Sequence, residues 1–469
     1  MNTHERRFPV PVSRRQIMIG AAGLSFAITL GRRMDAAEIA SERGGQALTP
    51  WVTIAPDGTI TIMSAAAEMG QGSMTSLPLI IAEELDADWS KIKIVPAPVI
   101  EKIYGNPGFG GMMYTAGSNA VRSYYDNLRL FGAQARRVLL DNAAKKFGVS
   151  VDELTTEPSR VVHSKSGRKL TYGEIAAFAE LPAQAPQIKP EDLKKPGNFR
   201  LITKDVMRAE LPHKVNGSAQ YSIDVQVPGM LYGAVLRAPV EGAAPEKFDE
   251  AKATAIKGVV KAVKLPYGVG VVAETPWAAF TARREIETNV VWSRDGKAWG
   301  FDSDRGLRDF AATARDPNAK ATEWFKLGDV RAEMPKAAST FEAKYLCDYA
   351  YHAQMEPLNA VAAVSASGDA AEVWCGTQSQ TMALEATANA LGLDRSKVKL
   401  NDTLLGGGFG RRGPRDMDFL VDAVLLSKAV GKPVKSMWTR EDDVHNGRFR
   451  PLSAHYLQAG FDASGKLMT

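Results

Sequence analysis

Cysteine is scarce in this sequence of 469 residues, with only Cys347 and Cys375 present. A cysteine-ligated iron–sulfur cluster needs about four thiolates, so this chain is not expected to hold one. Two cysteines also exclude a disulfide framework, and two buried free thiols are favoured over a single bridge between them. If the protein transfers electrons, another subunit must therefore accept them.

The sequence also lacks an excess of one charge and a long apolar run. Lysine and arginine number 58, and aspartate and glutamate 53. No basic stripe with interleaved aromatic residues occurs, so binding of nucleic acid is not expected. A membrane span requires about 20 apolar residues, and the apolar stretch from Gly20 to Leu30 is too short, so an integral membrane protein is not expected. The length fits about three domains.

Two adjacent arginines, Arg14 and Arg15, precede the apolar residues of the N-terminal segment. The pattern resembles a twin-arginine export signal, a receptor-read address that is excluded from the fold. An ordinary basic terminus is the alternative. We assign residues 1–40 to a signal region and expect a periplasmic protein that folds in the cytoplasm before export. Asp35-Ala36-Ala37 is an imperfect cleavage site.

The spacing of apolar residues predicts both strands and helices. Around the turn at Asp57-Gly58, residues 51–54 and 59–62 predict a hairpin. Further strands are predicted at 92–95, 221–224, 230–236, 259–265, 269–273, 341–345, 360–364, 398–400 and 434–439. Helices are predicted at 75–85, 119–147, 276–287, 382–391 and 416–430, and polar connections at 182–196 and 295–316. This mixture favours an α+β (mixed α/β) fold.

The chain ends abruptly. Phe461 to Met468 has the pattern of a hairpin turn that enters a strand, and the sequence stops there. We therefore expect a C-terminal truncation.

The most conspicuous segment for chemistry is the glycine-rich stretch from Gly406 to Gly413, which contains Arg411 and Arg412. Successive glycines let the backbone approach a ligand closely, and Pro414 suits the first position of a helix. A loop that leads into a helix N-terminus is a ready anion site. The stretch therefore predicts a loop that cradles a phosphate or a cofactor, and a glycine-rich turn that serves only tight packing is the alternative.

Gly408 to Gly413 also satisfies the G-x-G-x-x-G pattern, which raises the alternative of a dehydrogenase that binds FAD or NAD. Three features count against it. The pattern lies more than 400 residues into the chain, the preceding strand carries the polar Asn401 and Asp402, and no acidic residue closes a following strand about 20 residues later.

Two more glycine loops lead into predicted helices. Glu68 to Ser73 contains Gly70, Gln71 and Gly72, and Gln71 offers both a donor and an acceptor. The other loop combines Gly110-Gly111 with Gly117-Ser118-Asn119. Three helix entrances able to bind anions favour one large, phosphorylated cofactor.

A dedicated metal site is not expected. His352 and Glu356 stand four residues apart, but Pro357 follows and no third ligand is near. No zinc-type or Ser/His/Asp arrangement occurs.

Several motifs resemble those of the xanthine dehydrogenase and aldehyde oxidase family of molybdenum hydroxylases. They are most similar to the isoquinoline 1-oxidoreductase type of large (beta) subunit, in which the Met-Gly-Gln-Gly loop precedes the middle domain. The motifs, whose joint order is specific and which cover nearly all of the chain after residue 45, are 68–72, 211–239, 354–359, 376–379, 406–412 and 438–442.

The resemblance implies an α/β hammerhead domain at 206–300 between a cofactor-binding segment at 45–200 and a truncated molybdopterin-binding domain at 323–469. It implies a molybdenum–molybdopterin cofactor in the cytosine dinucleotide form. It also implies oxidation of an aldehyde or an N-heteroaromatic compound with water as the oxygen source. Electrons would leave through a small 2Fe–2S subunit, with a cytochrome c as a further acceptor.

The resemblance also assigns site residues. Gln378 matches the glutamine that hydrogen-bonds an oxygen on molybdenum, and Phe409 the aromatic residue beside the substrate, so both are assigned to catalysis. The resemblance assigns Gln71, Gly72, Gly408, Phe409 and Gly410 to cofactor binding, and the glycine-loop patterns add Gly117, Ser118, Gly407 and Arg411.

Two departures from the family pattern bear on function. Gly413 stands where purine-oxidising members carry a glutamate, which disfavours purines as substrates. The glutamate that acts as general base lies beyond the end of this chain, so the chain alone is expected to be inactive. An inactive fragment with a binding or assembly role is therefore a further alternative.

Overall fold

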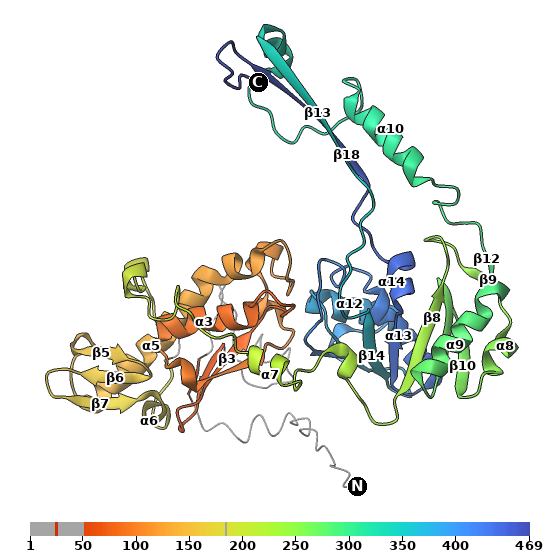
Figure 1. The fold of residues 1–469 in the computed structure, drawn as a ribbon. Helices are drawn as coiled ribbons and strands as arrows, with labels where there is room; N and C mark the ends of the chain where they lie inside the picture. Colours follow the sequence, from red (N-terminus) through yellow and green to blue (C-terminus); the bar gives the residue numbers. More distant parts are fainter. Residues whose placement is uncertain (1–23, 27–50, 183–184) are drawn as a thin grey trace. The chain divides into compact units, whose positions relative to one another are not determined.

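The computed structural model describes residues 24–26, 51–182 and 185–469, which form two compact units (Figure 1). The first unit comprises the described residues up to Val225 together with Glu372–Gly407 and Arg412–Met417. The second comprises Gln226–Ala371, Gly408–Arg411 and Asp418–Thr469. The arginine pair of the predicted export signal lies outside the described residues.

A four-stranded sheet of order β1-β2-β3-β4 forms the base of the first unit. Its strands are β1 (Leu24–Phe26), β2 (Val52–Ile54), β3 (Ile60–Ser64) and β4 (Ile92–Pro96). Strands β2 and β3 form the predicted hairpin, with Ile54 paired to Ile60. Strand β4 runs parallel to β3, so the chain must cross over between them, and helix α3 (Ser73–Leu85) makes the crossover.

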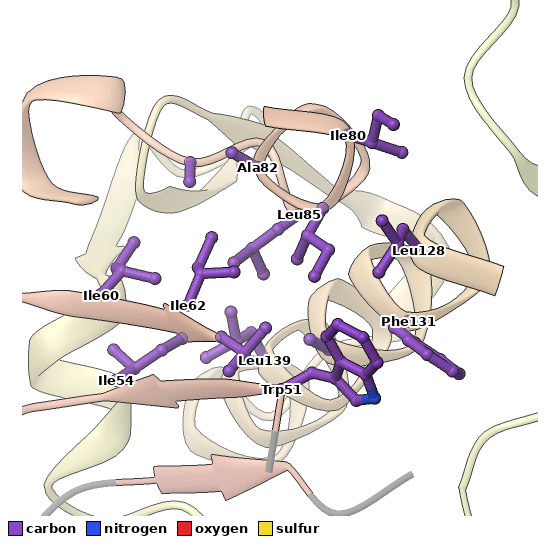
Figure 2. Close-up of a cluster of buried hydrophobic side chains, with 14 of the residues drawn as sticks. Trp51, Ile54, Ile60, Ile62, Ile80, Ala82, Leu85, Leu128, Phe131 and Leu139 are labelled. Atoms are coloured by element: carbon purple, nitrogen blue, oxygen red, sulfur yellow. The ribbon is translucent and has the colours of Figure 1, made fainter. Parts of the chain in front are cut away.

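Helix α3 and the long helix α5 (Asn119–Phe147) pack against each other in the first unit (Figure 1). A Cβ on Gly132 would lie 2.4 Å from the carbonyl oxygen of Ile81, so only glycine allows the two helices to approach this closely. Figure 2 shows isoleucines of β2 and β3, such as Ile60, in one cluster with leucines of the helices, such as Leu85 and Leu139. Each fully buried side chain of this size contributes about 1.5–3 kcal/mol.

Acidic residues at the C-terminal end of α3 fasten the segment 190–202 to this core. Glu83 is fully buried, and one of its carboxylate oxygens accepts the backbone N–H groups of Arg200, Leu201 and Ile202 at 2.9, 2.6 and 3.0 Å. Lys194 donates to the other oxygen at 3.0 Å and also to Asp86. Burial raises the pKa of Glu83, but these donors outweigh burial and lower it overall.

The remaining elements of the first unit are short apart from one helix. They are α4 (Glu101–Tyr104), β5 (Leu154–Glu157), β6 (Arg160–His163), β7 (Arg168–Thr171), α6 (Tyr172–Ala176), α7 (Leu211–Val215), β15 (Ala371–Cys375), α12 (Gln380–Leu391) and β16 (Val398–Asp402). Strands β5, β6 and β7 form an antiparallel sheet, and β15 and β16 are neighbours in another. This last pair and α12 join residues far along the chain to the N-terminal half.

The second unit contains a sheet with helices on both faces. Its strands follow the order β10-β11-β8-β17-β14, where β8 and β17 are parallel. The strands are β8 (Leu231–Arg237), β10 (Val259–Leu265), β11 (Gly268–Ala273), β14 (Asn359–Val364) and β17 (Val434–Met437). On one face Val271 packs with Ala282 of α9 (Pro276–Ile286). On the other, Val272 packs with Leu426 of α13 (Asp418–Val430).

Glycines in two of these strands make room for α13. A Cβ on Gly233 would lie 2.5 Å from one methyl carbon of Leu426, and a Cβ on Gly270 would lie 2.4 Å from the other. The side chain of Leu426 therefore sits against bare backbone of β8 and β11.

Other elements of the second unit lie outside this sheet. They are β9 (Pro245–Lys247), α8 (Glu250–Thr254), β12 (Val291–Trp292), α10 (Ser303–Arg315), α11 (Val330–Glu333), β13 (Ser339–Cys347), α14 (Arg440–Asn446) and β18 (Ser453–Phe461). Strands β13 and β18 pair antiparallel over their whole length, and α10 packs along them (Figure 1).

The mixed α+β class is confirmed, and four local predictions are wrong. Residues 222–224 form a 3₁₀ turn rather than a strand, and the expected connection at 295–316 contains α10, which Asp302 caps by accepting the N–H of Arg305. Helix α13 begins at Asp418, not near Pro414. Both cysteines are free, but Cys347 is exposed.

The compact units divide the chain differently from the expected domain ranges, which stay predictions, and residues 372–407 pack with the N-terminal half. The assignment of a hammerhead domain to 206–300 stays a prediction. Among the helices that the structure describes, none is both long enough and apolar enough to cross a membrane.

Glu83→Gln should destabilise the protein. A glutamine turns its NH₂ group either toward Lys194 or toward the three backbone N–H groups, so buried donors lose their acceptor, at a cost of about 1–3 kcal/mol. Urea unfolding at neutral pH measures this cost. Glu180→Gln is the control, because the side chain of Glu180 is 85% exposed, and a change within about 0.5 kcal/mol is expected there.

The pH dependence of stability provides a second measurement. Because folding lowers the pKa of Glu83, its contribution is complete above its ordinary pKa of 4.5 and is lost as the pH falls below that value. The difference in unfolding free energy between wild type and Glu83→Gln should therefore shrink as the pH falls below 4.5. A difference that stays constant down to acid pH would contradict this account.

Candidate functional site

Gln378 lies in the first unit, between the end of β15 and the start of α12. Its side chain is 3% exposed. The backbone N–H donates to the carbonyl of Arg412 at 2.9 Å, and the backbone carbonyl accepts the N–H of Thr115 at 2.7 Å. The side-chain Nε2 donates to the carbonyl of Thr115 at 3.0 Å. Backbone and side chain of Gln378 are therefore both held by one partner.

Thr115 also reaches the first glycine loop. Its Oγ1 accepts the N–H of Ala67 at 3.0 Å, immediately before Glu68. Nearby, the N–H of Met113 donates to Thr381, and Ser379 donates to the carbonyl of Met113. Three segments that the sequence singled out, 68–73, 110–119 and 376–379, thus meet around Thr115.

The glycine loop before α3 satisfies its own hydrogen bonds. The carboxylate of Glu68, which is buried, accepts the N–H groups of Gly70, Gly72 and Met74 at 2.8, 3.1 and 3.0 Å. Arg208 donates to the same carboxylate at 3.2 Å. The anion that this helix entrance binds here is therefore the chain's own Glu68.

Gln71 also folds back into its own loop. Its Nε2 donates to the carbonyl of Ala67 at 2.7 Å and to Ser73 at 2.6 Å, while its Oε1 accepts the N–H of Met69 at 2.9 Å. Gln71 and Gly72 shape the loop in this arrangement. Their assignment to the cofactor stays a prediction.

The entrance to α5 is open by comparison. Gly117 and Ser118 are exposed and have φ values of 57° and 55°, a left-handed conformation that is unusual for serine. Ser118 is the N-cap residue, but its side chain makes no capping hydrogen bond. With this cap unmade, the entrance of α5 is suited to a phosphate.

The glycine-rich stretch 406–413 is divided between the two units. Gly407 belongs to the first, with a φ of 97°. Gly408, Phe409, Gly410 and Arg411 belong to the second, and their assignment to the cofactor stays a prediction. Phe409 is 68% exposed and has a φ of 52°.

The two arginines of this stretch are structural. Arg411 is 1% exposed and binds Asp418 with two hydrogen bonds of 3.0 and 2.8 Å. Burial raises the pKa of Asp418, but Arg411 and Arg237 outweigh it and lower it overall. Arg412 is fully buried and donates to the carbonyl of Gly376 at 3.3 Å. Both guanidinium groups therefore make contacts within the fold, and the assignment of Arg411 to the cofactor stays a prediction.

A buried cluster continues from Asp418 within the second unit. The indole of Trp438 donates to Asp422 at 2.9 Å and lies under the guanidinium groups of Arg237 and Arg411. Tyr267 and Arg237 donate to the other oxygen of Asp422 at 2.8 and 2.7 Å. Charges that look available for a ligand in the sequence are thus neutralised within the second unit.

Sequence reasoning missed Thr115, Glu68 and Asp418 as organising residues. Two of these could have been recognised in the sequence. Glu68 is the first residue of its glycine loop, and Asp418 follows Arg411 by seven residues. Thr115 carried no such signal. No group of three histidine, cysteine, aspartate or glutamate side chains able to hold a metal occurs in the described part of the chain.

Comparison with known proteins decides the family. Models of the molybdopterin cofactor-binding domain match residues 10–223 and residues 313–469. The chain is 36% identical over 96% of its length to the isoquinoline 1-oxidoreductase beta subunit of Brevundimonas diminuta.

This chain belongs to the molybdopterin-binding subunits of the xanthine dehydrogenase family.

Other family members give the same assignment. The chain is 33% identical over 98% of its length to a membrane-bound aldehyde dehydrogenase (pyrroloquinoline-quinone) of Gluconacetobacter polyoxogenes. It is 29% identical over 84% of its length to one of the subunits of nicotinate dehydrogenase from Pseudomonas putida. It covers 62%, 60% and 32% of these three relatives, so it spans less than two thirds of their length.

Glu68→Ala should loosen the Met-Gly-Gln-Gly loop, because three amide donors lose their acceptor. Hydrogen exchange at Gly70, Gly72 and Met74 should become faster, while Glu68→Gln, which retains one acceptor oxygen, restores part of the protection. Glu191→Ala is the control, since Glu191 is exposed. Unchanged exchange in Glu68→Ala would show that the loop does not depend on the carboxylate.

Arg411→Ala should cost about 3–5 kcal/mol of stability, because it leaves the carboxylate of Asp418 buried without its main partner. Thermal or urea unfolding measures the loss. Arg415→Ala, outside this ion pair, is the control. The opposite result, lost cofactor at unchanged stability, would restore Arg411 as a ligand-binding residue.

Proposed function

We propose that this chain forms most of the molybdenum-binding subunit of a hydroxylase that oxidises an aldehyde or an N-heteroaromatic compound. The observation that carries the proposal is a set of hydrogen bonds at Thr115, which joins three motif segments. Thr115 bonds to Ala67 through its hydroxyl and to both the backbone and the side chain of Gln378. The names of the relatives point to the same substrate classes, since they include isoquinoline, nicotinate and aldehyde oxidoreductases.

The residues of the first unit fit a large phosphorylated cofactor. Gly70, Gly110 and Gly111 have positive φ values, and a Cβ on any of them would meet no atom within 4 Å, so open space adjoins these glycines. The exposed Gly117 and Ser118 at the start of α5 would hold a phosphate through backbone N–H groups. The entrance of α3 fits less well, because Glu68 already accepts its donors.

When bound, the molybdenum cofactor supplies a two-electron oxidation with water as the oxygen source. This chain contributes orientation and hydrogen bonding. The carboxamide of Gln378 has two N–H donors, and its link to the Thr115 carbonyl fixes the plane in which they lie. A donor oriented in advance toward a reacting oxygen stabilises the charge that develops there.

Gly413 supports the exclusion of purines. A Cβ at this position would lie 2.8 Å from a ring carbon of Tyr114 and 2.9 Å from its hydroxyl oxygen. The tyrosine therefore fills the space in which a glutamate side chain would have to begin. Aldehydes and N-heteroaromatic compounds remain the proposed substrates.

Export and partners complete the proposal. Arg14 and Arg15 support twin-arginine export to the periplasm. Because the chain has two cysteines, the electrons would pass to a small 2Fe–2S subunit and then to a cytochrome c. We propose the cytosine dinucleotide form of the cofactor. The FAD or NAD alternative is disfavoured by the start of α13 at Asp418, five residues beyond the glycine pattern.

The full-length protein, copurified with its small partner, should contain about one molybdenum per heterodimer. In that enzyme, Gln378→Ala should lower turnover by about 100-fold or more, the loss typical of removing one oriented donor, with molybdenum still bound. Gln458→Ala, at an exposed position of β18, should leave turnover unchanged. Absence of molybdenum would end the proposal, and full turnover of Gln378→Ala would remove Gln378 from the site.

A further inference from the structure

A buried carboxyl group is linked to the neighbourhood of Gln378 by way of Gln380, two residues further along the chain. Asp402 ends β16, and Gln380 is the first residue of α12 and only 3% exposed. Nε2 of Gln380 donates to Oδ2 of Asp402 at 2.8 Å. This contact ties the start of α12 to the neighbouring strand within the first unit.

Each of these two side chains also carries an oxygen without a side-chain partner. Oε1 of Gln380 and Oδ1 of Asp402 are both shielded from solvent, and neither has a hydrogen-bond partner among the described residues. A buried acceptor without a donor costs about 1–3 kcal/mol. The two side chains are hydrogen-bonded to each other. A single proton shared between their two buried oxygens would therefore satisfy both.

We propose that Asp402 is held in its protonated form and donates its O–H to Gln380, so that the two side chains form a cyclic acid–amide pair. In this pair Gln380 donates through Nε2 and accepts through Oε1, and Asp402 does the reverse. Both buried oxygens are then satisfied.

The surroundings of Asp402 favour the neutral form. Burial raises the pKa of Asp402 to about 7, and the hydrogen bond from Gln380 together with the nearby backbone N–H groups of Thr403 and Thr377 offsets burial only in part. A neutral carboxyl therefore competes with the ionised form near physiological pH.

Charged groups on the neighbouring elements are engaged elsewhere. Lys399 of β16 pairs with Glu372 of β15, and Arg395 pairs with Glu385 of α12. Asp224 accepts the N–H of Tyr221. The causes of the shift at Asp402 are burial and hydrogen bonds, without a charge. Attraction to a cation is therefore not among the causes given for the pKa of Asp402.

The pair also acts on Gln378, and this consequence rests on the proposed function. Asp402 contacts the backbone of Thr377 and the side chain of Gln380, which flank Gln378 and Ser379. We infer that Asp402 is a positioning residue. It holds both ends of the segment that presents the Gln378 carboxamide.

Infrared spectroscopy of the full-length protein tests the proton directly. The carbonyl band of a protonated carboxyl group should be present at pH 5 and disappear with a midpoint near the pKa of about 7. The band should be absent from Asp402→Asn and retained in Asp152→Asn, a control at an exposed aspartate. A spectrum without the band at pH 5, or a band unchanged in Asp402→Asn, would overturn the proposal.

Melting temperature provides a second readout that needs no cofactor. Folding raises the pKa of Asp402, so the folded protein binds an extra proton between the ordinary value of 3.8 and about 7, and wild-type stability should fall as the pH rises through that range. The amide of Asp402→Asn imitates the neutral acid, so this part of the decline should disappear and the variant should melt higher than wild type at pH 8. Equal pH profiles would overturn the proposal.

If Asp402→Asn does not fold, Gln380→Leu replaces it. This variant removes the acceptor of the proton, so the midpoint of the carboxyl band must move, and an unchanged midpoint overturns the pairing.

The positioning role is read in the molybdenum-loaded enzyme. Wild-type kcat should fall as the pH rises above about 7 while KM stays constant, and Asp402→Asn should lose this part of the profile. A profile identical in both would overturn the positioning role. Failure of the proposed function would look different, because molybdenum would be absent from the wild-type protein while the carboxyl band still titrated.

Discussion

The paired hydrogen bonds between Thr115 and Gln378 are the constraint on which the first unit depends. The two residues are 263 positions apart in the chain, yet Thr115 exchanges backbone and side-chain bonds with Gln378. The same threonine holds Ala67 through its hydroxyl. Because all of these groups are buried, each bond left unmade would cost about 1–3 kcal/mol, so the three segments can only be buried together.

Charged side chains in the glycine-rich segments are neutralised by partners within the chain. Glu68 occupies the amide groups of one glycine loop, and Asp418 occupies the guanidinium group of Arg411. Buried charges persist only when they are paired, and these pairs keep the loops in shape without a ligand. The N-terminus of α5, where Ser118 makes no capping bond, is the exception. These loops therefore offer a ligand backbone groups that are already in place, rather than unpaired charged side chains.

Most of the secondary structure follows from apolar spacing and turn residues. Helix α5 runs from Asn119 to Phe147, the range that periodicity predicts, and Gly148 ends it with a φ of 67°. The hairpin of β2 and β3 follows from alternation around Asp57-Gly58. Predictions failed where a short, largely polar segment was compatible with two different local structures. In α10, the cap by Asp302 decided for a helix, and at Ser222 the hydroxyl group's bonds to Thr403 and to Gly376 replaced a strand ladder.

The order and spacing of motifs along the chain predicted the family and the mixed α+β class, and they singled out the segments 68–73, 110–119 and 376–379, which meet around Thr115. Which groups in those loops remain for a ligand depends on the folded arrangement. The charge of Arg411 is taken by Asp418, and the amides beside Gln71 are taken by Glu68. Hydrogen-bond partners are set by distances across the folded chain, and no local pattern of residues encodes those distances.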